Sequence, residues 1–373
     1  MEAHPSVLEN NSLRKPHVLL INLVNFLLNF AVQASLIFIP LLGAQLGADD
    51  WHIGLVGASY GGSFLLSSLI SGWKSDALGR LRFVRFGLLA SSLAFAAQLL
   101  ARNLWLLMVI RSAVGLALGI ATAALIAHAF EAGADMGKFS SYGSLGWIFG
   151  ALGSAVLKEF NLLFLTSSVC CLLALSLSLS FRETTAEAQR IRARLWPVIL
   201  RNFRIYLAVF MRHLGAAAVW IILPLYLTDL GLDRSWIGLL WGVNFAVQFL
   251  VMRHLERFDE NRVFALGQLL SMGVFVAYAF VRAWPALVAV QALLGVAWSC
   301  LYVGALLLVL HSGEERGTAG GIFQSTLNLC GTVGPFQGGW IAEWWGYREV
   351  MLFAAGLGAF GLVVALPARE RRA

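Results

Sequence analysis

The sequence predicts an all-α membrane protein with twelve transmembrane helices, and two observations lead to this fold class. Of the 373 residues, 59% are hydrophobic and only 13% are charged, whereas soluble domains carry about a quarter charged residues. In addition, apolar runs of roughly 20 residues, long enough to span a bilayer, recur along the chain. Their centres lie near Phe30, Leu65, Leu93, Leu118, Phe149, Leu172, Ala218, Val243, Val274, Val296, Leu329 and Leu357.

The first run follows a polar segment, residues 1–16. Arg14 and Lys15 precede the run, as basic residues precede the apolar core of a secretory signal peptide. However, the run from Val18 to Leu42 is longer than such a core and has no evident cleavage site. We therefore expect a retained first membrane helix.

The second and third runs are separated by a charged turn that contains Gly72, Asp76, Gly79 and Arg80. Gly79 permits the positive φ that a tight reversal needs. The spacing Gly-x-x-x-Asp-x-x-Gly-Arg resembles the signature loop of the major facilitator superfamily, which lies between its second and third membrane helices. This resemblance implies two six-helix bundles, a substrate site between them near the membrane midplane and transport by alternating access.

The two halves of the chain repeat each other. An offset of 184 residues aligns Asp49 with Asp233, and after the second hairpin an offset of 180 aligns Arg102 with Arg282. Each copy has an even number of spans, so the copies enter the membrane the same way round and are related by a pseudo-two-fold axis along the membrane normal. In the second copy, residues 257–260 replace the last four signature positions.

The repeat and the polar stretch between its copies predict the domain organisation. We expect a cytoplasmic N-terminal segment (1–16), an N-terminal six-helix bundle (17–181), a cytoplasmic linker (182–202), a C-terminal six-helix bundle (203–366) and a cytoplasmic tail (367–373).

The charge distribution predicts the orientation. Lys and Arg outnumber Asp and Glu by 27 to 20, which gives a net charge of +7. Most of these cations fall on the side that carries both termini, so the positive-inside rule places both termini in the cytoplasm of a multi-pass protein of the inner cell membrane. The charge is then an orientation signal, and nucleic-acid binding is excluded because no soluble basic surface is predicted.

Polar side chains on several predicted helices are candidates for a substrate cavity. On the first helix, Asn25, Asn29 and Gln33 share one face with Asn22. Amides facing lipid would leave polar groups unpaired, so they line either a water-filled cavity, which we favour, or an interhelical hydrogen-bond network. Further candidates on other helices are Tyr60, Asn244, Gln248 and Asn328.

Arg111 is the most informative charge. A guanidinium in mid-span is costly, so it should face the interior and have a partner. The pattern of Leu107, Arg111, Gly115 and Gly119 resembles a motif of proton-coupled superfamily members, although Val114 replaces the usual glutamine. Thr122 shares this face, and the repeat places Gln291 at the position of Arg111 and Tyr302 at that of Thr122. The alternative is a structural arginine.

Arg212 and His213 form a second cationic position within a span. The repeat pairs His213 with Asn29, which favours an inward direction, and a histidine can carry a proton near neutral pH. Because every Asp and Glu falls outside the span centres, the candidates for proton coupling are Arg111 and His213, and the alternatives are a carboxylate near a gate or no coupling. A packing histidine is an equal alternative.

The resemblance to the superfamily implies a gate at the cytoplasmic ends of the helices. There Asp76 could accept hydrogen bonds from the start of the eleventh helix, residues 317–321, because a helix N-terminus favours an anion. Arg80 is expected to pair with Glu131 or Asp135.

These observations predict a secondary active transporter of a small polar or amphipathic solute, similar to sugar or drug carriers. An organic-anion transporter that uses Arg111 and Arg212 is the alternative, and a non-transporting membrane sensor is a minor one. No enzyme activity, cofactor or metal site is expected, since the four cysteines fall inside spans and suit packing. The expected partners are the substrate, the lipid bilayer and, in a coupled transporter, protons, with the chain acting as a monomer.

Overall fold

The computed structural model describes residues 5–134, 136–181, 195–313 and 316–365, and these contain helices and short connections but no strand. Two 3₁₀ turns, Gln98–Leu100 and Leu255–Arg257, follow α4 and α10. The α-helices are α1 (Pro5–Leu36), α2 (Ile39–Gln45), α3 (Asp50–Leu78), α4 (Arg80–Ala97), α5 (Leu104–Glu131), α6 (Met136–Leu157), α7 (Phe160–Ser178), α8 (Leu195–Arg201), α9 (Phe203–Asp229), α10 (Arg234–Met252), α11 (Glu260–Phe280), α12 (Trp284–His311), α13 (Arg316–Trp345) and α14 (Tyr347–Ala365).

Ten segments of the described chain are long and apolar enough to cross a membrane, and α1 and α2 together make one of them. The protein is therefore a multi-pass membrane protein. The long helices α6 and α13, of 22 and 30 residues, are not among the ten. Both are rich in glycine, which permits close contact: a Cβ added at Gly150 of α6 would lie 2.8 Å from the Phe30 carbonyl oxygen of α1.

Three local features differ from the sequence-based expectations. The first span is interrupted, because α1 ends at Leu36 and α2 starts beside Pro40. The charged turn is shorter than expected: α3 continues to Leu78, and Gly79 alone, with φ of 95°, separates it from α4. The described end of the linker is helical, since α8 buries Val198 in an apolar cluster of the second half.

The helices of each half pack mainly against one another. In the first half α5 lies against α3 and α4, and in the second half α12 lies against α10 and α11. The main contacts between the halves are those of α3 with α13 and of α6 with α10. We call the end of the molecule where α3 begins the Asp50 end and the opposite one the Gly79 end.

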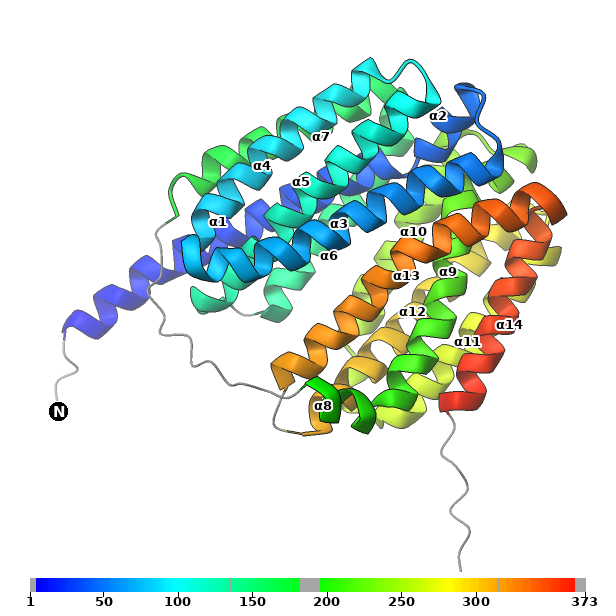
Figure 1. Cartoon of the computed structure of the whole chain (residues 1–373). Coiled ribbons are helices and arrows are strands. Elements are labelled where there is room, and N and C mark those ends of the chain that lie inside the picture. Colours follow the sequence, from blue (N-terminus) through cyan, green and yellow to red (C-terminus); the bar gives the residue numbers. More distant parts are fainter. Residues whose placement is uncertain (1–4, 135, 182–194, 314–315, 366–373) are drawn as a thin grey trace, which may run out of the picture.

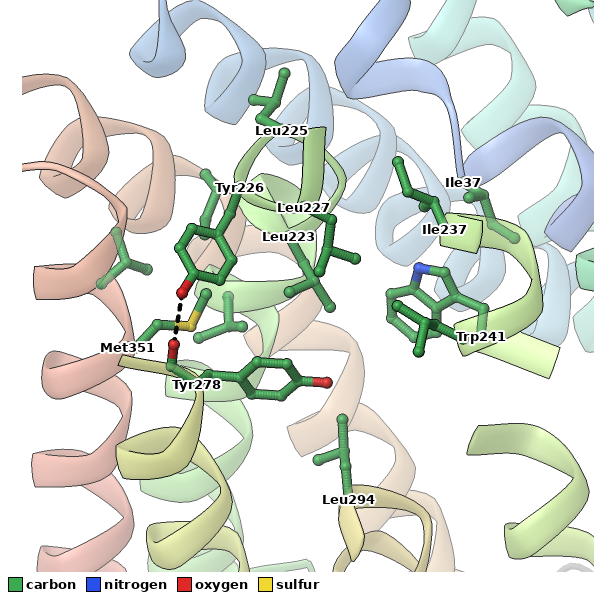
Figure 2. Close-up of a cluster of buried hydrophobic side chains, with 14 of the residues drawn as sticks. Ile37, Leu223, Leu225, Tyr226, Leu227, Ile237, Trp241, Tyr278, Leu294 and Met351 are labelled. Atoms are coloured by element: carbon green, nitrogen blue, oxygen red, sulfur yellow. Dashed lines mark hydrogen bonds between the residues drawn. The ribbon is translucent and has the colours of Figure 1, made fainter. Parts of the chain in front are cut away.

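The two halves share one apolar core at the Asp50 end. A single cluster contains Ile37 and Phe38 from the first half together with Leu223, Ile237 and Trp241 from the second. Figure 2 shows Ile37 beside Ile237 and Trp241, and a hydrogen bond from the Tyr226 hydroxyl to the Tyr278 carbonyl oxygen. Burial of these side chains stabilises the contact between the halves at this end.

At the Gly79 end each half has its own core. Leu81, Phe139 and Phe181 belong to a cluster made only of first-half residues, whereas Val198 and Val309 belong to one made only of second-half residues. Figure 1 shows the same difference, with α3 and α13 close together near the Asp50 end and diverging toward the Gly79 end. The halves are thus joined at one end and separated at the other.

Candidate functional site

The polar residues of α1 form hydrogen bonds with α6. Asn25, 6% exposed, donates from Nδ2 to the Phe139 carbonyl oxygen at 2.7 Å. Asn29 donates from Nδ2 to Asn25 Oδ1 at 2.9 Å, and its own Oδ1 accepts from Trp147 Nε1 at 2.7 Å. Gln33 is buried next to the close α1–α6 contact. An interhelical network therefore accounts for Asn25, whereas Asn29 is half-buried and Trp147 is exposed.

Arg111 lies inside the first half, as its charge requires. The residue is 2% exposed, its Nη1 donates to Gln98 Oε1 at 3.2 Å, and its Cζ lies 4.4 Å from the centre of the Tyr60 ring. The expected buried position with a partner is confirmed. Hydrogen bonding to a neutral amide and a cation–π contact both stabilise the charge, and the half-buried Tyr60 connects it to a less buried region.

The second half has an equivalent contact without the charge. Asn244 stands where the repeat places Tyr60, and Gln291 where it places Arg111. Asn244 Nδ2 donates to the Gln291 carbonyl oxygen at 3.1 Å, and Asn244 Oδ1 accepts from Gln248 Nε2 at 2.6 Å. The Gln291 side-chain amide is fully buried and has no hydrogen-bond partner within the described chain.

Arg212 is the more unusual of the two buried arginines. Its side chain is fully buried, its Nε donates to Ser271 Oγ at 2.8 Å, and its Cζ lies 5.1 Å from the centre of the Trp298 ring. Nη1 and Nη2 have no hydrogen-bond partner among the described residues. A buried guanidinium with two unsatisfied nitrogens is costly, so an acceptor at these atoms would stabilise the charge.

His213 belongs to a group of rings that we call the aromatic cluster. Its ring stacks on Trp298 with centroids 4.9 Å apart and meets the edge of Trp220 at 5.1 Å. Tyr302 continues the group, 5.5 Å from Trp298 and 5.4 Å from Phe323. Trp220, Trp298 and Tyr302 are half-buried, so the cluster presents apolar ring surface with a few polar atoms.

Within the aromatic cluster, the sequence-based reasoning named His213 and Tyr302 as candidates but missed Trp220 and Trp298, and it also missed Trp147. A signal was present, because tryptophans in membrane proteins concentrate at the interfaces, whereas Trp147, Trp220 and Trp298 lie near the middle of long helices. A tryptophan near the middle of a membrane helix therefore indicates a candidate binding surface.

The remaining predicted cavity residues lie on α5 and α13. Thr122 is half-buried on α5. On α13, Gln324 is exposed and donates from Nε2 to Oδ1 of the half-buried Asn328 at 3.3 Å. An exposed amide such as Gln324 would be unfavourable against lipid, so this face of α13 suits a polar environment.

The predicted gate residues are partly described. Gly72 and Asp76 lie in the last turns of α3, but their side-chain environments, like Asp135, lie outside the described residues. Arg80 Nη2 and Glu131 Oε1 form an ion pair at 2.7 Å, with side chains 18% and 16% exposed. This pair connects α4 to the end of α5, and both helices belong to the first half.

Long apolar helices around a polar and aromatic interior define a multi-pass membrane transport protein. The family model for the Major Facilitator Superfamily matches residues 21–247 and 205–373, so the chain belongs to this superfamily, as the signature turn indicated. It is a secondary transporter that works by alternating access and is not an enzyme. Within the described residues, no group of histidines, cysteines and carboxylates has the arrangement of a metal site.

Known proteins resemble this chain over nearly its whole length. The multidrug resistance protein MdtG of Salmonella typhimurium (strain LT2) is 26% identical, with 93% of this chain and 94% of the relative covered. Among solved structures, the nucleoside transporter NupG has a TM-score of 0.77 and 15% identity, covering 93% of this chain and 98% of that one. A bacterial homologue of the human lysosomal transporter Spinster, in an inward-facing and occupied conformation, has a TM-score of 0.78 and 14% identity, covering 94% and 96%.

Proposed function

We propose that the protein moves small amphipathic, drug-like solutes across a bacterial inner membrane. The observation that carries this proposal is the aromatic cluster, which offers the half-buried rings of Trp220, Trp298 and Tyr302 near the middle of the helices. Ring surfaces bind flat apolar solutes with little demand on hydrogen-bond geometry. The resemblance to MdtG, named as a multidrug resistance protein, supports the same substrate class.

In this proposal the chain has twelve spans, with α6 and α13 added to the ten apolar segments. They form two six-helix bundles, residues 17–181 and 203–366, joined by the linker 182–202. The Gly79 end faces the cytoplasm together with both termini. The separate cores at the Gly79 end and the shared core at the Asp50 end support a conformation open toward the cytoplasm.

We further propose that the signature residues form a gate at the Gly79 end. Asp76 would bind the start of α13 when this end closes, with Gly72 and Gly79 permitting the approach of helices. The Arg80–Glu131 pair, with Asp135 nearby in sequence, would hold the ends of α4 and α5 as one unit. The 2.7 Å contact between Arg80 and Glu131 supports this role.

Proton coupling is a separate part of the proposal. No described carboxylate lies near the middle of a long helix, so the candidates remain His213 and Arg111. His213 is favoured because its Nδ1 has no hydrogen-bond partner within the described chain.

An organic anion is the second candidate substrate. The observation that favours it is the pair of unpartnered Arg212 nitrogens beside the aromatic cluster, because a guanidinium binds a carboxylate through two parallel hydrogen bonds. Arg111 is the less suitable anion site, since Gln98 and Tyr60 already occupy part of its surface.

Counterflow in proteoliposomes separates the two substrate classes with a matched pair of probes, neutral 2-naphthamide and anionic 2-naphthoate. For an amphipathic substrate we expect naphthamide exchange, reduced about 2- to 10-fold by Trp298→Ala, the effect of losing one aromatic contact, and little changed by Arg212→Gln. For an anion transporter, naphthoate exchange is lost in Arg212→Gln.

The control variant is Trp344→Ala, at a residue that is 69% exposed near the end of α13. Exchange of neither probe, or equal rates in all variants, would contradict the proposal.

A further inference from the structure

Two contacts at the Asp50 end tie the halves together by placing a charge at the end of a helix. In the first, Glu343 Oε2 of α13 accepts a hydrogen bond from the backbone N–H of Asp50, the first residue of α3, at 2.9 Å. Tyr347 of α14 donates from its hydroxyl to Asp50 Oδ1 at 3.0 Å. A helix N-terminus carries partial positive charge, so the Glu343 carboxylate is stabilised there. We call this contact the acidic clasp.

In the second contact, Arg234 of α10 donates from Nη1 to the Lys158 carbonyl oxygen at 2.7 Å. Lys158 directly follows the last residue of α6, where the partial charge of the helix is negative and favours a cation. The Arg234 guanidinium also lies 4.1 Å from the centre of the Phe160 ring, on the first residue of α7. We call this contact the basic clasp.

The clasps are equivalent in the repeat but opposite in charge. The offset of 184 residues that aligns Asp49 with Asp233 also aligns Asp50 with Arg234. Each clasp joins the start of the second helix of one half to the end of the fifth helix of the other, and each has an aromatic ring at the start of the following helix, Tyr347 or Phe160. The basic clasp contains a guanidinium in place of the Asp50 carboxylate.

Acidic groups surround Asp50. A pocket of about 780 Å³ between the halves is lined by Asp50 with further charged or titratable residues from neighbouring elements other than α2, which contributes only uncharged residues. These are Asp49 on the α3 side, Asp229 of α9, Asp233 and Arg234 at the start of α10, Glu343 of α13 and Tyr347 of α14. On α3 itself, His52 Nδ1 lies 3.5 Å from Asp49 Oδ2. Carboxylates therefore outnumber the single Arg234 cation among the pocket-lining side chains.

We propose that the acidic clasp is a pH-sensitive switch that closes the Asp50 end when a proton binds to the Asp50 carboxylate. When the halves are joined, Asp50 meets Glu343 and Asp229 of the other half, and these like charges repel. When the halves separate at this end, the carboxylates move apart into water and the repulsion falls. The joined state therefore holds a proton on Asp50 more tightly, so acid favours this state by linkage.

This switch acts from the side that the Asp50 end faces, and it does not carry a proton across the membrane. It depends on alternating access but not on the proposed substrate. If one carboxylate differs by one pKa unit between the two states, full protonation changes the equilibrium between them about tenfold.

The test measures the distance across the Asp50 end by double electron–electron resonance between two spin labels. Spin labels are placed by Arg102→Cys and Arg282→Cys, two exposed and repeat-equivalent positions, in a chain whose native cysteines are replaced. From pH 7.5 to pH 5 we expect the population with the short distance to grow, with an equilibrium shift of about twofold, because an aspartate with an ordinary pKa near 3.9 that rises by one unit is only partly protonated at pH 5. Asp50→Asn and Glu343→Gln should each abolish or strongly reduce this shift.

Arg234→Gln is the matched control, because it breaks the basic clasp without removing a carboxylate. It should reduce the short-distance population at both pH values and leave the pH response intact. Wild-type distances that do not change with pH, or a full response in both Asp50→Asn and Glu343→Gln, would overturn the proposal. Because no substrate is added, a failed transport assay would contradict only the proposed function. Asp229→Asn is also expected to weaken the pH response, and it replaces Asp50→Asn or Glu343→Gln in the test if either of these does not fold.

Discussion

Gly61→Ala tests the inference that α3 and α13 separate during transport. In the structure, a Cβ at Gly61 would lie 2.5 Å from the Gly331 carbonyl oxygen and 3.0 Å from Thr332 Cα, both of which are backbone atoms of α13. Neither atom can rotate away, so the helices must move apart. Overpacking of this kind costs about 1–3 kcal/mol, and it applies only to the conformation in which the halves are joined at the Asp50 end.

The joined conformation should therefore lose population by a factor of about 5 to 150, since 1.4 kcal/mol corresponds to tenfold. Spin labels at Arg102→Cys and Arg282→Cys report this change as a shift toward longer distances across the Asp50 end. Alanine also raises helix propensity over glycine by roughly 1 kcal/mol, but this gain applies to both conformations and cancels in their ratio.

Gly62→Ala is the control on the same helix. A Cβ at Gly62 would meet only the Thr332 side-chain methyl, at 3.3 Å, and that methyl can move by a few tenths of an ångström. We expect the Gly62→Ala distances to match those of the parent protein. If the two alanine variants give the same distance distribution, the close α3–α13 contact does not control the conformational equilibrium, and the reasoning is wrong.

Two further predictions concern stability. Arg80→Gln or Glu131→Gln should each lower the free energy of unfolding by about 1–3 kcal/mol, because each breaks the 2.7 Å ion pair between partly buried charges. The double variant should lose less stability than the sum of the two single variants. Melting-temperature shifts that simply add would refute the coupling. Trp147→Phe removes the 2.7 Å hydrogen bond to Asn29 Oδ1 and should lower the free energy of unfolding by about 1 kcal/mol. The control is Trp344→Phe, at an exposed position near a helix end, and the Trp147→Phe protein should melt at a lower temperature than this control.

Much of the fold was predictable because the bilayer allows few solutions. A spanning segment must satisfy its own backbone hydrogen bonds, so apolar runs become helices. The turn at Gly79 was predicted from glycine and charge, although its length was not, because α3 continues through the charged residues up to Leu78. The helix α8 within the linker was missed, since its stability depends on burying Val198 against the second half.

The candidate site was predicted only in part. The cost of a buried charge was enough to place Arg111 inside the protein with a partner, and Gln98 and Tyr60 supply it. The same reasoning did not separate a cavity wall from a hydrogen-bond network for Asn25, because both satisfy an amide equally well. The structure gives Asn25 a partner on α6 and leaves Gln324 exposed on α13.

The sequence by itself determined that the chain spans a membrane repeatedly and that it belongs to a transporter superfamily, because these properties follow from composition, periodicity and a local motif. Only the tertiary structure decided that the halves meet at the Asp50 end, that Asp50 and Arg234 hold them there, and that Trp298 lies between Arg212 and Tyr302. Such contacts join residues far apart in the chain. They depend on helix packing in one conformation, and conformations that differ by a few kcal/mol share the same sequence pattern.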